Sequence, residues 1–549
     1  MDADVVIVGT GVAGALIGWR LATAGVTVLM LEAGPQVDRN AAVNRARAAV
    51  AQTPGRPYEN PPWAERPDFA DGLAYYDQTG PQPFSSTYER VVGGTTWHWL
   101  GSMIRLLPTD FAMRSTYGVG VDWPLTYDEL EPWYLEGERQ LGVSGDPAHD
   151  LGSPRSAPYP LPPIPISYSD QHVAKAAASL GWRVDPTPQA RNSQPFQGRP
   201  QCCGNAYCIP ICPIQAKYDA TVHVKLAQAA GARVVENAVV HRIDVDAEGK
   251  VSALRYLRPD RSEATVTGGR YLIAANAIET AKLLLISRTD ALPDGVANRS
   301  GKVGRHLADH PVKLSIALAK EPVYPLRGPL STAGIEQLRN VPERASRSAF
   351  RVEIGNDGWS WPGLDPLGIA SALIDAGAFG PDLFNAVAPA AANQLRFSSL
   401  CEQLPDEESR VTVDPAVTDP LGIPRPVLHY RVQPYTDAGL AAAEQALDHL
   451  FDALGVTYRH HFPGFYGAGH LMGTHRMGTD PADSVTDPDG RTHDHPNLWL
   501  AGCGLFPTTG TANPTATVAA LSLRTADALL RELGVATPVA SPAATPVAS

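Results

Sequence analysis

Hydrophobic and polar positions alternate with different periods along the chain, and these periods predict its elements. Residues 4–32 read as strand, glycine turn, helix and strand, the pattern of a parallel βαβ unit. A strand leading into a helix recurs at 270–287, and 495–530 reads as strand, loop and long helix. Between them, 312–430 holds alternating runs such as KLSIALA and FRVEIG, which predict an antiparallel sheet. Residues 437–454 predict a helix with one apolar face.

The turn after the first apolar run carries the pattern GxGxxG, at Gly9, Gly11 and Gly14. Glu32 ends the second run, at the spacing typical of an acid that binds a ribose hydroxyl. Glycines here let the backbone approach a pyrophosphate at the N-terminus of the helix. With its strand, helix and acid in place, the pattern predicts a dinucleotide site, and Glu32 fits FAD or NAD rather than a 2′-phosphate.

Three strand–helix segments that lie far apart in the chain predict one discontinuous domain. We expect an α/β fold, in which a Rossmann-like FAD-binding domain carries an inserted α+β substrate domain built on an antiparallel sheet. The expected boundaries are 1–110, 190–311 and 462–533 for the FAD-binding domain, and 111–189 and 312–461 for the substrate domain with its connections. The low-complexity stretch 534–549 is predicted to be disordered.

Length and composition limit the possible functions. At 549 residues the chain is too long for one hydrophobic core, and its net charge of −12 argues against general binding to nucleic acid or to an anionic membrane. Six cysteines are too few for a disulfide scaffold. Neither a secretory signal nor an apolar run long enough to span a bilayer is visible, so we expect export or membrane attachment to need another chain.

Four of the six cysteines, Cys202, Cys203, Cys208 and Cys212, lie in the stretch QCCGNAYCIPICP at 201–213. Their spacing fits a zinc ribbon poorly, and adjacent cysteines cannot pair with each other without strain. An iron–sulfur cluster needs several thiolates from a tight, irregular loop, which the glycine and prolines here would supply. The residues alone favour a cluster and leave zinc and disulfides open.

Several motifs together give the chain a family resemblance. Besides the glycine turn, they are RVVGGTTWHWLG at 90–101, AGHLMGTHRMG at 468–478 and AGCGLFPTTGTANPT at 501–515. In this order they resemble the glucose–methanol–choline oxidoreductases. Within that family, residues 190–224 resemble the flavoprotein subunit of three-subunit, membrane-bound sugar dehydrogenases, while the active-site motifs also resemble those of pyranose oxidases.

The resemblance implies an alcohol oxidation at FAD. His470 in GHLMGT corresponds to the family's catalytic histidine and Asn513 in TANPT to the second member of the pair. Histidine suits a general base because its unperturbed pKa of about 6.5 leaves it largely neutral. We therefore expect hydride transfer from a hydroxyl of a sugar, polyol or aldonate to the flavin. One alternative is an oxidase that passes electrons to oxygen and makes hydrogen peroxide. Another is an electron-transfer or assembly protein without turnover, but the presence of His470 and Asn513 argues against it.

Further flavin contacts follow from the same resemblance. Gly93 and Gly94 would let the backbone approach the flavin ring, and His98 either attaches FAD covalently or only packs against the ring. The remaining expected cofactor-binding residues are Val239, Ala275, Asn276, Gly502 and Thr515. Asn276 and Glu279 either close the dinucleotide site or cap a helix. The last candidates are Arg305, Asp309 and His310. They either contact the substrate or only support their loop, and the sequence leaves both interpretations open.

The sugar dehydrogenase flavoproteins hold a 3Fe–4S cluster, and the resemblance places its ligands at Cys202, Cys208 and Cys212. The cluster would pass electrons singly to a cytochrome or an artificial acceptor. The resemblance also implies a small chaperone-like subunit with a twin-arginine signal, disulfide-linked through Cys203, and a multihaem cytochrome c subunit, but no nucleic acid. The expected location is the periplasm or the outer face of the cytoplasmic membrane with these partners, and the cytoplasm without them.

Overall fold

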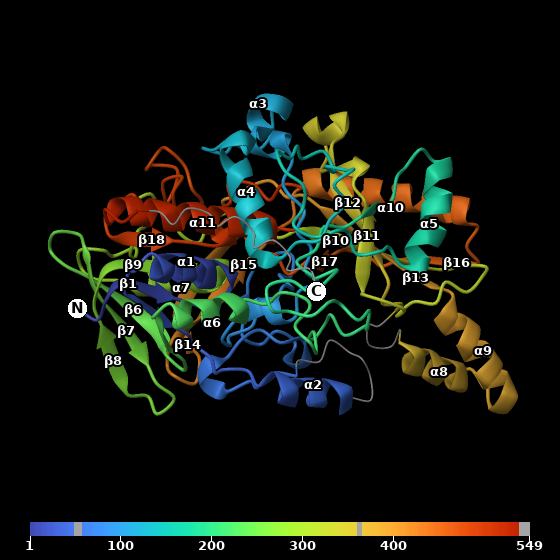
Figure 1. Ribbon diagram of the computed structural model, residues 1–549, viewed down its shortest axis with the longest axis horizontal. Coiled ribbons are helices and arrows are strands. Elements are labelled where there is room, and N and C mark those ends of the chain that lie inside the picture. Colours follow the sequence, from blue (N-terminus) through green and yellow to red (C-terminus); the bar gives the residue numbers. More distant parts are fainter. Residues whose placement is uncertain (49–56, 360–364, 537–549) are drawn as a thin grey trace, which may run out of the picture.

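The structure is a computed structural model that describes residues 1–48, 57–359 and 365–536 (Figure 1). Most of the stretch predicted to be disordered, from 537 to 549, lies outside these residues. Within the described part, no helix has the length and apolar character needed to cross a bilayer.

One half of the molecule is built on a five-stranded parallel sheet with the order β18-β9-β1-β2-β5. Its strands are β1 (Ala3–Val8), β2 (Val28–Leu31), β5 (Arg233–Val235), β9 (Gly268–Ile273) and β18 (Leu498–Leu500). The helices that flank it include α1 (Val12–Thr23), α6 (Thr221–Ala229), α7 (Asn276–Ile286) and α11 (Thr515–Glu532), and α4 (Tyr127–Leu141) packs on α11. Strands from three distant parts of the chain thus share one sheet, as the fold-class prediction requires.

A small antiparallel sheet lies beside this one, with the order β6-β7-β8. Its strands are β6 (Val239–Val245), β7 (Val251–Leu257) and β8 (Glu263–Val266). A further three-stranded sheet joins β3 (Asp77–Gln78), β14 (Arg410–Thr418) and β15 (Pro424–His429). The chain also forms the short helices α2 (Arg39–Ala48) and α3 (Met113–Tyr117).

The other half is built on a seven-stranded antiparallel sheet, in which β10, β13 and β12 form the centre (Figure 1). Its strands are β4 (Asp185–Pro186), β10 (Pro311–Leu318), β11 (Ser331–Ile335), β12 (Phe350–Gly355), β13 (Gln394–Cys401), β16 (Tyr458–His461) and β17 (Tyr466–Gly467). Helix α10 (Pro434–Leu454) lays its predicted apolar face on the sheet beside α5 (Tyr168–Ser179), and Leu447, Leu450 and Phe451 are fully buried there. The predicted fold class is confirmed, whereas the residue boundaries of the two domains stay predictions.

Two regions differ from the sequence interpretation. No helix was predicted between 142 and 200, yet this stretch contains α5, which begins at Ser167 with a capping box to Asp170 and packs Val173 into the core. The region expected to be only sheet contains the helices α8 (Pro366–Asp375) and α9 (Gly380–Ala392). The helices α5 and α8 start at clear capping residues, Ser167 and Asp365, whereas α9 has no side-chain cap, and the apolar patterns of all three are weak or unusual.

Candidate active site

The glycine turn after β1 has the shape that the sequence predicts. Gly9 has a φ of +96°, and a Cβ on it would lie 2.5 Å from the carbonyl oxygen of Ala274. A Cβ on Gly14 would lie 2.1 Å from the carbonyl oxygen of Gly9, so this glycine allows α1 to pack closely on the turn. A Cβ on Gly11 would meet nothing within 4 Å, and this residue faces a cavity instead. The three glycines therefore shape a backbone cradle at the N-terminus of α1.

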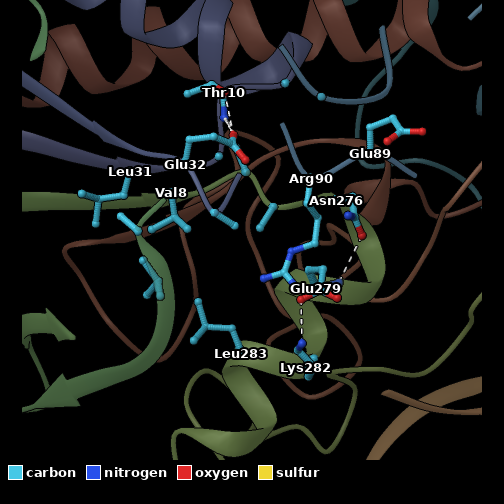
Figure 2. Close-up of a pocket in the computed structure, with 18 of the residues that line it drawn as sticks. Val8, Thr10, Leu31, Glu32, Glu89, Arg90, Asn276, Glu279, Lys282 and Leu283 are labelled. Carbon is cyan, nitrogen blue, oxygen red and sulfur yellow. Dashed lines mark hydrogen bonds and ion pairs between the residues drawn. The ribbon is translucent and has the colours of Figure 1, made fainter. Parts of the chain in front are cut away.

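Glu32 directly follows β2 and lies at the wall of a cavity of about 120 Å³ (Figure 2). Its carboxylate accepts hydrogen bonds from the backbone N–H of Thr10 (3.0 Å), the hydroxyl of Thr10 (2.6 Å) and the N–H of Gly34 (3.2 Å). Burial raises the pKa of Glu32, and these hydrogen bonds oppose the rise. An oriented, buried acceptor at this place fits a ribose hydroxyl.

The same cavity is closed on its far side by a buried polar cluster around Glu279 (Figure 2). Glu279 pairs with Lys282 at 2.8 Å and accepts hydrogen bonds from the hydroxyls of Tyr75 (2.7 Å) and Tyr88 (2.5 Å). Although burial alone would raise the pKa of Glu279, Lys282 and Arg90 hold it at about 2. The sequence interpretation placed Glu279 here but missed Arg90 and Lys282, although the spacing of Glu279 and Lys282 on one helix face could have indicated the pair.

A second cavity, of about 340 Å³, continues from the glycine turn into the interior. Both cavities have Gly11 and Asn276 in their walls, so they form one elongated site. The predicted residues that line the second cavity are Gly11, His98, Asn276, His470, Gly502, Asn513 and Thr515; Glu32, Gly9, Gly94 and Ala275 line the first. This site fits FAD, because it is elongated, has an open backbone cradle at Gly11 and has a buried hydrogen-bond acceptor at Glu32.

Two predicted contacts differ from this picture. Ala238 and Val240 line the first cavity, whereas the predicted Val239 between them has its side chain buried elsewhere. Successive residues of a strand face opposite sides, so a contact of Val239 with the cofactor would come from its backbone, and its role stays a prediction. Gly93 shapes the loop rather than the cavity wall, since a Cβ on it would lie 2.8 Å from the side chain of Thr221.

Asn276 and His98 have further contacts. Asn276 has a φ of +60° and its side chain accepts hydrogen bonds from the N–H groups of Ile278 (2.9 Å) and Glu279 (3.1 Å). It therefore caps α7 and also lines both cavities, and its contact with the dinucleotide stays a prediction. His98 lies with its Nδ1 at 3.2 Å from a carboxylate oxygen of Glu89, and its covalent attachment to FAD stays a prediction.

His470 and Asn513 lie together in the wall of the second cavity, with 3.5 Å between His470 Nε2 and Asn513 Nδ2. Arg351, fully buried on β12, donates to Asn513 Oδ1 (3.1 Å), which turns the amide nitrogen toward His470. Glu336 and Glu353 neutralise Arg351 at 2.8 and 3.2 Å. Arg351 was missed, because a lone arginine in an alternating strand carries no local signal.

Burial lowers the pKa of His470 well below its ordinary value, and the neighbouring His310 and Arg351 lower it further. The ring is therefore neutral at physiological pH, as a group that accepts a proton must be. Asn513 can donate a hydrogen bond to an oxygen in the same cavity. The pair can thus deprotonate a hydroxyl group and orient its oxygen.

The loop before β10 supports this pair. One oxygen of Asp309 accepts the backbone N–H groups of His310 (2.7 Å) and His470 (3.1 Å), while the other contacts the hydroxyl of Ser86. Burial raises the pKa of Asp309 to about 7. His310 Nδ1 lies 2.8 Å from His470 Nδ1. Arg305 lies in the wall of a different, open pocket and donates to the carbonyl of Gly301, so only His310 and Asp309 join the site.

The four clustered cysteines carry free thiols, of which Cys208 is buried and Cys203 exposed. Arg191 donates to Cys208 Sγ at 3.2 Å, and backbone N–H groups lie against the sulfurs of Cys202 (3.4 Å) and Cys212 (3.5 Å). Burial raises the pKa of Cys202, and nearby Cys208 and Cys212 add to the rise. Such N–H donors to sulfur suit thiolate ligands.

The thiols do not form a metal centre as they stand: among the described residues, no group of three or more His, Cys, Asp or Glu side chains is arranged to hold a metal ion. The loop nevertheless reaches the second cavity, because Ile209, next to Cys208, lines the same wall as His470 and Asn513. Lys217 connects the two regions as well, since its ammonium donates to the carbonyl of Trp99, which lines the second cavity, and its backbone N–H lies against Cys212 Sγ.

Comparison with known proteins gives consistent matches over the whole chain. Residues 161–312 and 405–522 match the family described as GMC oxidoreductase. The chain is 38% identical to the fructose dehydrogenase large subunit of Gluconobacter japonicus, over 97% of this chain and 98% of that protein. It is 31% identical to the 6'''-hydroxyparomomycin C oxidase of Streptomyces lividus, over 96% and 92%. The crystal structure of pyridoxine 4-oxidase from Mesorbium loti superposes with a TM-score of 0.67 at 20% identity, covering 96% of this chain and 99% of that one.

Proposed function

This chain belongs to the GMC oxidoreductase family, and we propose that it is an FAD-dependent dehydrogenase that oxidises a hydroxyl group of a sugar, polyol or aldonate. The observation that carries the proposal is the neutral, half-buried His470, which faces the same cavity as Asn513 and the glycine turn. The fructose dehydrogenase relative supports sugar as the substrate class.

The residues of the cavity have distinct roles in this reaction. Bound FAD supplies the acceptor for the hydride that leaves the alcohol carbon. His470 Nε2 accepts the hydroxyl proton, and Asn513 Nδ2 donates a hydrogen bond to the alcohol oxygen. Arg351 keeps the Asn513 amide in the orientation that makes this possible. Its low-polarity surroundings keep His470 neutral until it takes the proton.

The cysteine loop supports a route for electrons out of the site. We place a 3Fe–4S cluster at Cys202, Cys208 and Cys212, where it would supply one-electron transfer to a cytochrome or an artificial acceptor. Three points support this: the resemblance of residues 190–224 to the sugar dehydrogenase flavoproteins, the N–H donors at all three sulfurs, and the position of Ile209 in the cavity lining.

Partner chains belong to the same proposal. The relative from Gluconobacter is named as a large subunit, which supports a multi-subunit enzyme. We expect a small subunit with a twin-arginine signal and a multihaem cytochrome c, with the exposed Cys203 available for a disulfide to the small subunit. With these partners the enzyme would work at the outer face of the cytoplasmic membrane.

An oxidase is the second candidate, because the relative from Streptomyces lividus is named as one. Anaerobic mixing with a panel of sugars, polyols and aldonates tests both. We expect at least one compound to bleach the flavin absorbance, and iron and acid-labile sulfide to be present in the same sample. Stoichiometric hydrogen peroxide in air and absence of iron would favour the oxidase. If no compound of any class bleached the flavin, the proposed reaction would be wrong.

A further inference from the structure

Two histidine rings meet at the centre of the catalytic wall. His310 and His470 are 160 positions apart in the chain, yet their rings are nearly perpendicular and their Nδ1 atoms lie 2.8 Å apart. Two nitrogens at this distance must share a hydrogen, so one ring donates and the other accepts. Which of them donates decides whether His470 can act as a base at the cavity.

The contacts of His310 answer the question. Its Nε2 lies 3.0 Å from the carbonyl oxygen of Gly510, and a carbonyl can only accept, so Nε2 carries a hydrogen. Burial lowers the pKa of His310 to about 4, so the ring is neutral and its Nδ1 has no hydrogen. The hydrogen between the two rings therefore belongs to His470 Nδ1, and neutral His470 has a free lone pair at Nε2.

The opposite tautomer of His470 would meet two unfavourable contacts. Its Nδ1 lone pair would face the Nδ1 lone pair of His310 at 2.8 Å, and its Nε2–H would point at the amide nitrogen of Asn513 at 3.5 Å. Asp309 fixes the backbones of the two histidines relative to each other, because one of its oxygens accepts the backbone N–H groups of both. A buried carboxylate and a backbone carbonyl thus determine the position and the hydrogen of the catalytic ring.

We propose that His310, held by the carbonyl of Gly510, is a positioning residue that fixes His470 in the tautomer whose Nε2 is free to accept the substrate proton. The proposal rests on the proposed function in assigning the proton to His470. When His470 becomes protonated, its Nδ1–H continues to donate to His310, so no rearrangement accompanies the reaction. Wrong-tautomer variants of the serine protease triad, in which geometry is kept, lose about 10⁴-fold in kcat, which shows how large such an effect can be.

The test compares two variants of nearly equal size, His310→Asn and His310→Leu. The Asn side chain keeps an acceptor that can face His470 Nδ1, and the Leu side chain has none. With the substrate that bleaches the flavin, we expect His310→Leu to lower kcat by about tenfold or more with little change in KM or FAD content, and His310→Asn to recover most of the loss. Equal kcat values for the two variants would overturn the proposal, because a purely steric role treats them alike.

A second measurement depends neither on activity nor on the two His310 variants. In holoenzyme labelled with ¹⁵N-histidine, the signal that disappears in His470→Ala belongs to His470, and ¹⁵N chemical shifts distinguish a protonated Nδ1 from a protonated Nε2. We expect protonated Nδ1 in the wild type. Protonated Nε2 would overturn the proposal. If the tautomer is as expected but His470→Ala remains fully active, the proposed role of His470 as base is wrong instead.

Discussion

Replacing Gly11 or Gly14 by alanine separates the two functions of the glycine turn. At Gly14 the added Cβ would lie 2.1 Å from the carbonyl oxygen of Gly9 and 3.4 Å from a methyl group of Ile7, so α1 must move away from β1. Overpacking of this kind costs about 1–3 kcal/mol. At Gly11 the added Cβ meets nothing within 4 Å, and the φ of −63° and ψ of −176° are accessible to alanine.

The two variants should therefore behave oppositely. We expect Gly14→Ala to lower the free energy of unfolding of the apoprotein by about 1–3 kcal/mol. Gly11→Ala should leave it unchanged or raise it by about 0.4–1 kcal/mol, because alanine reduces the entropy of the unfolded chain. The Cβ of Gly11→Ala points into the cradle, where the same overpacking cost of about 1–3 kcal/mol would weaken FAD binding by about 5- to 150-fold.

Denaturant unfolding of the apoproteins and titration with FAD, followed by flavin fluorescence, measure the two effects. Wild-type FAD affinity in Gly11→Ala would refute the assignment of the cradle to the pyrophosphate. Wild-type apoprotein stability in Gly14→Ala would refute the packing argument at α1. A loss of stability in both variants would mean that the turn is a structural feature alone.

Three further outcomes follow from the site. His470→Ala should lower alcohol oxidation at least about 10²-fold while FAD stays bound, and an enzyme left at half its activity would contradict the role of a general base. Serine variants of Cys202, Cys208 and Cys212 should each lose iron and visible cluster absorbance while Cys203→Ser keeps both; loss of iron in Cys203→Ser would mean a different set of ligands. Because burial lowers the pKa of His470, its base form persists as the pH falls through about 6.5, so kcat/KM should decline only at lower pH. A profile of kcat/KM against pH whose acid limb has its midpoint at or above about pH 6.5 would contradict this expectation.

The sequence by itself determined the parts of this protein that depend on a few neighbouring residues. The turn at Gly9, Gly11 and Gly14 needs positive φ and missing side chains, and Glu32 lies one strand further on, so spacing alone predicts the cradle and its acceptor. The periodicity of α10 predicts its buried face for the same reason, since the helical repeat fixes which side chains share a side.

Motif resemblance extended the prediction to His470 and Asn513, and the structure brings both into the predicted cavity. It could not show which face of a strand a side chain takes: Ala238 and Val240, the neighbours of Val239, line the first cavity, because a shift of one residue exchanges the faces. The cysteine loop lies between these cases: the sequence shows the clustered thiols, but their contact with the catalytic cavity through Ile209 comes from the fold.

The tertiary structure alone decided how the catalytic ring is held. Arg351 is 162 positions from Asn513, and His310 is 160 from His470 and 200 from Gly510, and no periodicity marks any of these pairs. His310 directly precedes β10 and Arg351 lies in β12. The antiparallel sheet places both beside the loops that follow the distant strands β17 and β18. A local pattern reports hydrogen bonding and burial over a few residues, whereas a hydrogen bond across the whole fold depends on how the two sheets pack together.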